Sequence, residues 1–383
     1  MKIKLKGFIT SKESELYSDC ADHYAFSKEN LKFAISDGVS RSFFPKFWSR
    51  ILVEKYVEKE TWKEEDFILC SQEHWQNEVD EIVKSPDTMY FTRNAYNRKT
   101  PGLATFVGLQ FLPKEKKWIA QALGDSFLFF VPKDCKDFDK DTIKLSSKDE
   151  PFVFDNYPDY LSSIGDLHKG ESRKVKGKEL KDGTFYLMTD ALAEWFLQGK
   201  GIESAITTIK NIKSQEQFLE TIDNERKANR LHNDDSALLI IEISKTRKQK
   251  VSFSEIEVSS LKSLIENQSK EIEKEEKKKE GEEKLETSSN SNSFAEENKQ
   301  KSTEPEVPEN QEEISELEEE NNEPQEGIEN QIERQEGKDT ENTDSAIKEN
   351  EPEKEEKEKS QTRKENKQDG DEEEKPQSII DKF

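Results

Sequence analysis

The sequence is poor in apolar residues and in the residues that build disulfide and zinc sites. Its 383 residues are 31% hydrophobic and 38% charged, and they include only three cysteines and four histidines. No run approaches the roughly 20 apolar residues that a membrane-spanning helix requires. The lysine-rich start MKIKLKGFIT lacks the apolar centre of a secretory signal. The cysteines form no CxxC pair and cannot close a disulfide framework. These absences predict a cytoplasmic protein without a membrane partner.

Basic and aromatic residues are scarce in the last third of the chain. Acidic residues outnumber basic ones by 84 to 60, but residues 251–383 carry 43 acids against 20 bases, whereas residues 1–250 are nearly balanced. Such a charged, apolar-poor segment cannot bury enough surface to offset the entropy of ordering it. We therefore expect a globular domain at 1–245 and a mostly disordered acidic tail at 246–383, with a short helix near 254–275. Without a basic face, a nucleic-acid partner is not expected.

Apolar runs before residue 245 predict strands, and amphipathic segments between them predict helices. Short turns within 104–131 indicate hairpins and hence antiparallel sheet, and the helices must cover its faces. The expected fold class is therefore α+β in layers, not a doubly wound sheet. Strands are expected at 32–36, 104–112, 117–123, 126–131, 184–188 and 236–243, and helices at 45–60, 64–84, 191–197 and 201–212.

The common phosphate-loop, dinucleotide, zinc-protease and hydrolase motifs are missing, but aspartates recur in turns beside apolar strands. A strand fixed in a sheet holds a carboxylate at its end with little freedom. Several such carboxylates at one edge would repel each other and favour a hard cation such as Mg²⁺ or Mn²⁺. Taken singly, each aspartate could instead have a structural role, because turns favour aspartate. The aspartates are Asp37 in FAISDGVS, Asp125 in WIAQALGDS, Asp190 in FYLMTDALAEW, and Asp234 and Asp235 in NDDSALLIIEI.

The order of these motifs resembles that of the PPM-type, metal-dependent serine/threonine protein phosphatases, the 2C class, in a bacterial-like form. That family shows an early Asp, an Asp-Gly after a strand, a Gly-Asp-Ser, a Thr-Asp-Gly and a late Asp-Asp or Asp-Asn, and here Ala191 stands in place of the glycine after Asp190. The resemblance spans roughly residues 5–243 and implies a central sandwich of two antiparallel β-sheets flanked by helices, in α-β-β-α layers. The matching positions are Asp19, Asp37-Gly38, Gly124-Asp125-Ser126, Thr189-Asp190 and Asp234-Asp235.

The resemblance also implies a centre of two Mg²⁺ or Mn²⁺ ions, with a weaker third. It implies that Asp37 bridges both ions beside the Gly38 carbonyl, and that Asp190 and Asp234 complete the ligands. Two such ions can lower the pKa of a shared water and aim it at phosphorus. The implied catalytic set is Asp19, Asp37, Asp190 and Asp234, with Asp19 acting through water and Asp125 at the third ion.

The sequence departs from the family at its phosphate-binding arginine. KGFITSKESELY contains no arginine, and Ser40-Arg41 stands where the family has Gly-Gly. Arg41 and Lys12 are therefore the candidate phosphate contacts, although lysine lacks the planar guanidinium fork and Arg41 could equally be a solvent-exposed loop residue. His232 could donate a proton to the leaving group or be a surface histidine.

We expect hydrolysis of phosphoserine or phosphothreonine in proteins by a water that two metal ions activate. The expected partners are phosphorylated proteins and a cognate serine/threonine kinase. The alternative is a catalytically weak or inactive relative that binds phosphoprotein or metal, and a third hypothesis is a phosphatase-like sensor whose acidic tail binds a partner. The tail carries none of the motifs, so we expect it to be dispensable for a small substrate.

Overall fold

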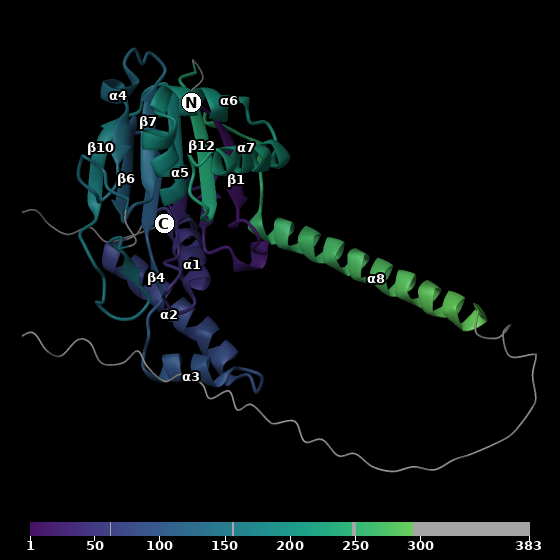
Figure 1. The fold of residues 1–383 in the computed structure, drawn as a ribbon. Coiled ribbons are helices and arrows are strands. Elements are labelled where there is room, and N and C mark those ends of the chain that lie inside the picture. The colour runs from purple at the N-terminus through teal and green to yellow at the C-terminus, as the bar shows by residue number, and fades with distance from the viewer. Residues whose placement is uncertain (62, 155–156, 247–249, 294–383) are drawn as a thin grey trace, which may run out of the picture. The chain divides into compact units, whose positions relative to one another are not determined.

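The computed structural model describes residues 1–293 apart from 62, 155–156 and 247–249 (Figure 1). The chain divides into two compact units, 1–301 and 302–383. The second unit, and with it most of the expected tail, lies outside the described residues. No helix in the described part is both long and apolar enough to cross a membrane.

Two sheets form the centre of the first unit. The first sheet has the strand order β13-β1-β12-β11-β7-β8, and the second has the order β10-β6-β5-β3-β2. Neighbouring strands are antiparallel, except that β13 runs parallel to β1. The strands of the first sheet are β1 (Lys2–Thr10), β7 (Phe127–Pro132), β8 (Ile143–Leu145), β11 (Gly183–Met188), β12 (Ser236–Ser244) and β13 (Ser252–Val258). Those of the second are β2 (His23–Ser27), β3 (Lys32–Ser36), β5 (Phe106–Leu112), β6 (Lys117–Leu123) and β10 (Arg173–Glu179).

Helices cover both outer faces of this pair of sheets, and a short two-stranded ladder, β4 (Leu103–Ala104) with β9 (Leu161–Ser162), lies beside them. Pro45 occupies the first turn of α1, as expected, where its missing N–H costs nothing. The helices are α1 (Pro45–Glu58), α2 (Glu64–Lys84), α3 (Tyr90–Asn97), α4 (Phe138–Asp141), α5 (Asp190–Glu194), α6 (Ile202–Asn211), α7 (Gln215–Lys227) and α8 (Leu261–Ser293). Two short turns complete them, the 3-10 helix η1 (Tyr17–Asp19) and a π-helical turn at Trp195–Gly199.

Alternate residues of each strand enter different apolar layers. On β12, Leu239 and Ile241 lie in the core between the sheets, whereas Leu238 and Ile240 pack with α5, α6 and α7. On the opposite side, Ala34 of β3 packs against the buried face of α1. This alternation follows from the two-residue period of a strand. It confirms the predicted α+β sandwich in α-β-β-α layers.

Most predicted elements form close to their predicted bounds, but several elements were not predicted. They include the inner strand β1, the edge strands β10 and β13, and the helices α3 and α7. Strand β10, RKVKGKE, offers little apolar surface, and it forms because β6 supplies its hydrogen-bond partners. Strand β13 was likewise not expected, because residues 254–258 were assigned to a helix. In the structure they form a strand, and the helix begins only at Leu261.

Strand β13 belongs to the sandwich through contacts that the sequence pattern did not reveal. Phe253 stacks on Phe26 and Phe33 with ring centroids 6.1 and 6.2 Å apart. The Ser259 amide donates to the Gly7 carbonyl over 2.9 Å, and the Tyr24 hydroxyl donates to the Ser259 carbonyl. We therefore propose that the folded domain extends beyond residue 245, at least through Ser259.

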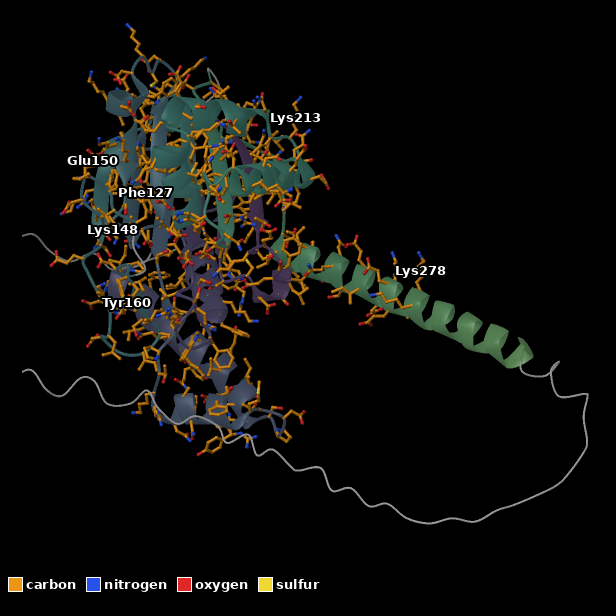
Figure 2. All side chains as sticks on the ribbon, viewed as in Figure 1. Phe127, Lys148, Glu150, Tyr160, Lys213 and Lys278 are labelled. Atoms are coloured by element: carbon orange, nitrogen blue, oxygen red, sulfur yellow. The ribbon has the colours of Figure 1, made fainter. Side chains whose placement is uncertain are left out.

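Helix α8 begins against the domain and then becomes a highly charged helix. Its first turns pack Leu261 and Leu264 against the core between the sheets, and Gln268 Oε1 accepts a hydrogen bond from the Tyr17 amide over 2.9 Å. Farther along, charged side chains such as Lys278 line the helix (Figure 2). The first turns of α8 therefore contact η1, the short helix that carries Asp19.

Candidate metal centre

Strand register brings the sequence-predicted aspartates to one end of the sandwich. His23 pairs with Ser36 across the β2–β3 ladder, so Asp22, just before β2, and Asp37, just after β3, lie at the same end. In the first sheet Met188 of β11 pairs with Leu238 of β12. Asp190 therefore follows one strand, and Asp234 and Asp235 precede its neighbour, at that end as well.

Small residues and turns hold the connecting loops in place. Gly124, between β6 and β7, has a φ of +96°, and a Cβ there would lie 2.6 Å from the Thr105 side chain. The Thr105 hydroxyl contacts Ser126 at 2.7 Å and accepts a hydrogen bond from the Asp37 amide over 3.2 Å. Gly38 is packed so closely that a Cβ would lie 2.8 Å from the Pro45 carbonyl oxygen. The Asp-Gly and Gly-Asp-Ser motifs are thus joined through one threonine.

The acidic side chains raise one another's pKa values. Burial, together with the charges of Asp125 and Asp234, raises the pKa of Asp37 to about 7. Burial and the charge of Asp37 also raise the pKa of Asp22 and of Asp190 well above the usual range. A carboxylate removed from water and placed near others favours its neutral form. This end of the sandwich therefore carries closely spaced negative charges when every carboxyl group is ionised.

Asp22 is the acid that the sequence analysis missed. Its side chain is 1% exposed, and no described residue donates a well-formed hydrogen bond to either carboxylate oxygen. The Thr189 hydroxyl opposes the rise of its pKa but does not outweigh burial and repulsion. Asp19, the predicted early aspartate, is instead exposed on η1. The signal that could have found Asp22 is its place directly before the strand that pairs with the Asp37 strand.

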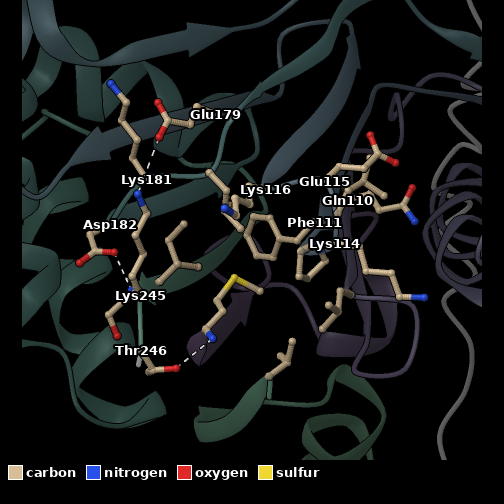
Figure 3. A pocket seen from close by; sticks show the side chains of 18 of the residues that line it. Gln110, Phe111, Lys114, Glu115, Lys116, Glu179, Lys181, Asp182, Lys245 and Thr246 are labelled. Atoms are coloured by element: carbon tan, nitrogen blue, oxygen red, sulfur yellow. Dashed lines mark hydrogen bonds and ion pairs between the residues drawn. The ribbon is translucent and has the colours of Figure 1, made fainter. Parts of the chain in front are cut away.

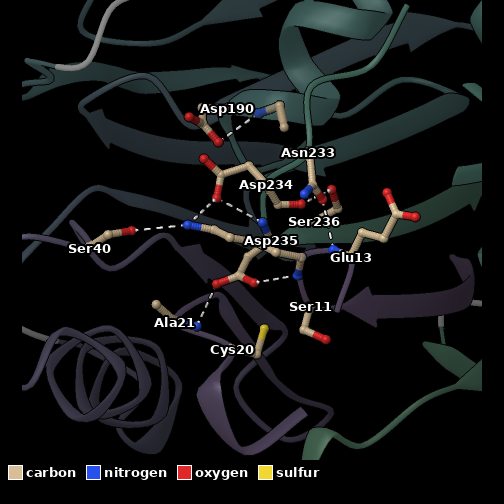
Figure 4. Close-up of polar contacts among 12 residues, drawn as sticks. Ser11, Glu13, Cys20, Ala21, Ser40, Asp190, Asn233, Asp234, Asp235 and Ser236 are labelled. Carbon is tan, nitrogen blue, oxygen red and sulfur yellow. Dashed lines mark hydrogen bonds and ion pairs between the residues drawn. The ribbon is translucent and has the colours of Figure 1, made fainter. Parts of the chain in front are cut away.

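Asp235 holds two loops together rather than facing the other acids freely. Its Oδ1 accepts the Lys12 amide over 3.0 Å, and its Oδ2 accepts the Ala21 amide over 2.8 Å (Figure 4). Arg226 adds to this framework by donating to the Asp234 carbonyl over 2.6 Å and to the Ser11 carbonyl over 3.3 Å. The backbones of Lys12 and of Ala21, the residue before Asp22, are therefore fixed by the same carboxylate.

The candidate cationic and proton-donating residues lie in different surroundings. Lys12 Nζ is 3.0 Å from Asp234 Oδ1; burial disfavours the ammonium, but Asp234 outweighs it and raises the pKa of Lys12. Arg41 is exposed, and in the described part of the chain it forms no hydrogen bond or ion pair. His232 is 77% exposed and its Nδ1 lies 3.1 Å from Glu194 Oε2. Only Lys12 thus reaches a predicted metal ligand.

The carboxylates are gathered, but they are not arranged as a finished coordination shell. Within the described ranges, no group of three or more His, Cys, Asp or Glu side chains is placed to hold a metal ion. Asp190 Oδ1 accepts the Ala191 amide over 2.6 Å, and Asp234 Oδ1 accepts the Asp235 amide over 2.8 Å. The buried oxygens of Asp22 nevertheless need a partner, and an all-oxygen donor set suits Mg²⁺ or Mn²⁺. The residue types therefore fit a hard divalent cation.

A separate cavity of about 920 Å³ lies at the other end of the sandwich (Figure 3). Its wall includes Phe111, the β5–β6 turn and the last residues of β12. Charges of both signs surround it, and Lys245 lies 3.7 Å from Glu179 and donates its amide to Asp182 over 2.6 Å. No sequence-predicted site residue lines this cavity, so it is distinct from the acidic end.

Known proteins resemble the chain in fold only. No protein-family model matches the sequence, and no curated protein matches it. Among solved structures, it is similar to Stp1, a serine/threonine phosphatase from Staphylococcus aureus, with TM-score 0.42 and 11% identity over 63% of this chain and 95% of Stp1. The catalytic domain of the serine/threonine protein phosphatase PstP, solved with two manganese ions, gives 0.40 and 9% over 63% and 99%. PppA, a key regulatory component of the T6SS in Pseudomonas aeruginosa, gives 0.41 and 11% over 63% and 98%.

Proposed function

We propose that the chain is a metal-dependent phosphatase that hydrolyses phosphoserine or phosphothreonine in proteins. The observation that carries the proposal is the convergence of Asp22, Asp37, Asp190 and Asp234 at one end of the sandwich. Burial and repulsion within this cluster raise the pKa values of Asp22, Asp37 and Asp190. Perturbed carboxyl groups that gather from separate loops mark functional sites more often than they mark structural ones. Phosphorylated proteins are the proposed partners, with a serine/threonine kinase as their source.

Each aspartate has a proposed part in holding two Mg²⁺ or Mn²⁺ ions. We assign Asp37, the Gly38 carbonyl, Asp190 and Asp234 as ligands, and Asp125 as a ligand of a third ion. Asp22 replaces Asp19 as the early acid, because Asp22 is buried in the cluster. Bound ions of this kind would lower the pKa of a shared water and neutralise the phosphoryl oxygens.

The chain's own residues prepare this site before any ion binds. Asp235 fixes the loop of Lys12 to the residue before Asp22, so that these groups keep their spacing. Protons on the buried carboxyl groups must leave when a cation binds, so binding is expected to strengthen as pH rises. Lys12 is the cation nearest to the cluster, while Arg41 would have to turn in from solvent to contact phosphate.

The test is turnover of p-nitrophenyl phosphate and of a phosphothreonine peptide, with and without Mn²⁺. Asp37→Asn should lower kcat by about 100-fold or more, because a bridging ligand and the activated water are lost together. The exposed Asp134→Asn is the matched control and should keep wild-type rates. Mn²⁺-independent turnover, or full activity of Asp37→Asn at saturating Mn²⁺, would overturn the proposal.

A non-catalytic binding protein is the second candidate. The observation that favours it is the lack of a ready-made coordination shell among the described residues, together with the missing arginine near Lys12. Such a protein would bind Mn²⁺ or the phosphothreonine peptide without turning it over. Calorimetric titration of the peptide alongside the turnover assay separates the two functions.

A further inference from the structure

One cation already lies at the Asp234 side of the acidic end, and it belongs to the chain itself. Lys12 Nζ is 3.0 Å from Asp234 Oδ1 and 3.2 Å from the Ser40 hydroxyl (Figure 4). The side chains of Lys12 and Asp234 are 23% and 42% exposed. The ammonium thus bridges the loop after β3, which carries Asp37, and the loop before β12.

The position of this ammonium is defined by the surrounding backbone. The Lys12 amide is bound by Asp235, and the Asp234 carbonyl accepts a hydrogen bond from Arg226. Both ends of the ion pair therefore start from anchored main chain, so that forming the pair costs less side-chain entropy than for two free surface residues. Lys12 is the charge partner that this arrangement supplies to Asp234.

The carboxylates at the acidic end differ in what their oxygens contact. Asp234 points one oxygen at Lys12 and at its own neighbour's amide, and Asp190 points one at the Ala191 amide. Asp22, by contrast, has buried oxygens without a well-formed donor in the described chain. The Asp234 side thus has a counter-charge in Lys12, whereas in the described residues the buried Asp22 oxygens lack a hydrogen-bond partner.

We propose that Lys12 is a resident counter-cation that competes with a divalent ion for Asp234. The inference rests on the proposed function, and it adds a regulatory property to the same site. When a divalent ion takes Asp234, the ammonium is released toward Ser40 and the open side of the cluster, where an incoming phosphate dianion would attract it. A lysine performs this exchange better than an arginine, because its single charged centre makes no planar fork with the carboxylate.

The test is calorimetric titration of Mn²⁺ into the full-length chain, which requires no turnover. Lys12→Met should bind Mn²⁺ on the order of three- to tenfold more tightly than the wild type, because a partly exposed ion pair no longer has to be broken. Lys12→Arg should bind no more tightly than the wild type, since it keeps the charge. Lys4→Met is the matched control. It removes the ion pair between Lys4 of β1 and Glu242 of β12, 3.1 Å long, which lies outside the site.

A second measurement separates competition from a purely structural role. The melting temperature of Lys12→Met should fall in metal-free, low-salt buffer, and the gap from the wild type should close at saturating Mn²⁺. Equal Mn²⁺ affinity of Lys12→Met and the wild type, or an equal loss of melting temperature with and without Mn²⁺, overturns the inference and leaves the proposed function standing. Absence of Mn²⁺ binding in the wild type and in every variant overturns both.

Discussion

Asp22 and Asp37 lie at one end of the sandwich because their neighbours, His23 and Ser36, are paired across the β2–β3 ladder. The ladder is antiparallel, so the start of one strand meets the end of the other. Because the Asp22 carboxyl group is buried and that of Asp37 is partly buried, their charges repel strongly. Burial and then the charge of Asp37 are the largest causes of the raised pKa of Asp22. Two loops separated by a hairpin thereby become one electrostatic unit.

Asp22 and Asp19 should differ sharply when each is replaced by asparagine. Asp22→Asn should lower Mn²⁺-dependent kcat by about tenfold or more, because it removes a buried carboxylate from the cluster. Asp19→Asn should leave kcat within about twofold, since Asp19 is exposed on η1. Steady-state kinetics on p-nitrophenyl phosphate check both variants, and the reverse order of effects would return the early-acid role to Asp19.

The carboxyl cluster should stabilise the metal-free chain less as pH rises. The folded-state pKa values of Asp22, Asp37 and Asp190 lie above the usual 3.8, so these groups bind more protons in the folded chain than in the unfolded chain between about pH 4 and 7. Their contribution to the free energy of unfolding should therefore decrease across that range, by about 2 kcal/mol or more. Urea titrations of the wild type and Asp37→Asn in chelator at pH 5 and pH 8 measure the Asp37 part of this contribution.

Two controls sharpen the pH experiment. Asp37→Asn should be more stable than the wild type at pH 8 without metal, because it removes one repelling charge. Saturating Mn²⁺ should abolish or reverse that difference, since the wild type then gains the binding free energy. A stability difference between Asp37→Asn and the wild type that is the same at pH 5 and pH 8 in chelator would contradict the electrostatic account of the site.

His23 should act in the opposite direction, at acid pH. Its ring contacts the Ser49 hydroxyl at 3.0 Å, and burial lowers its pKa from 6.5 to about 3. Between pH 6.5 and 3, His23 therefore binds a proton in the unfolded chain but not in the folded chain. The free energy of unfolding decreases as pH falls through this range. At pH 4 the cost is up to about 3 kcal/mol.

The contribution of His23 is isolated by comparison with His23→Asn. The difference in free energy of unfolding between wild type and variant should favour the wild type at pH 7 and shrink as pH falls to 4. His74→Asn is the control, because this histidine is exposed on α2. A difference that stays constant with pH would show that the His23 ring is protonated as easily in the folded chain.

Truncation should reveal where the folded domain ends. A chain ending at Lys250 lacks β13, and with it the Phe253 ring stacked on Phe26 and Phe33. It should melt well below a chain ending at residue 275, which keeps β13 and the first turns of α8. The longer chain should hydrolyse p-nitrophenyl phosphate at the full-length rate, because the acidic remainder carries none of the site residues.

The chain ending at residue 275 also separates two roles of the acidic residues that it lacks, 276–383, when its activity is measured at several salt concentrations. A polyanion alters encounters with charged phosphoproteins, and that effect fades as ionic strength rises. Activity on phosphoproteins should therefore differ from full length mainly at low salt. A tenfold loss of kcat on the small substrate would place part of the remainder within the catalytic unit, contrary to expectation.

The sequence by itself determined the layers of the fold and most of the acidic set. Two-residue alternation in strands such as β12 and helical spacing in segments such as α1 depend on local geometry, so they can be predicted without knowing the partners. Asp37, Asp125, Asp190 and Asp234 were found because each lies in a turn beside a strongly apolar strand.

Only the tertiary structure decided which early acid is buried, which edge strands form and which cation contacts Asp234. Asp22 lies buried near Asp37, whereas Asp19 is exposed, because the pairing of His23 with Ser36 is a property of two strands and neither strand alone contains it. Strand β13 formed, against expectation, because β1 offered a free edge and Phe26 and Phe33 offered surface for Phe253. Lys12 reached Asp234 across more than two hundred residues because β1 and β12 are neighbours. Long-range pairing of this kind is set by which surfaces can be buried together, and no local pattern records it.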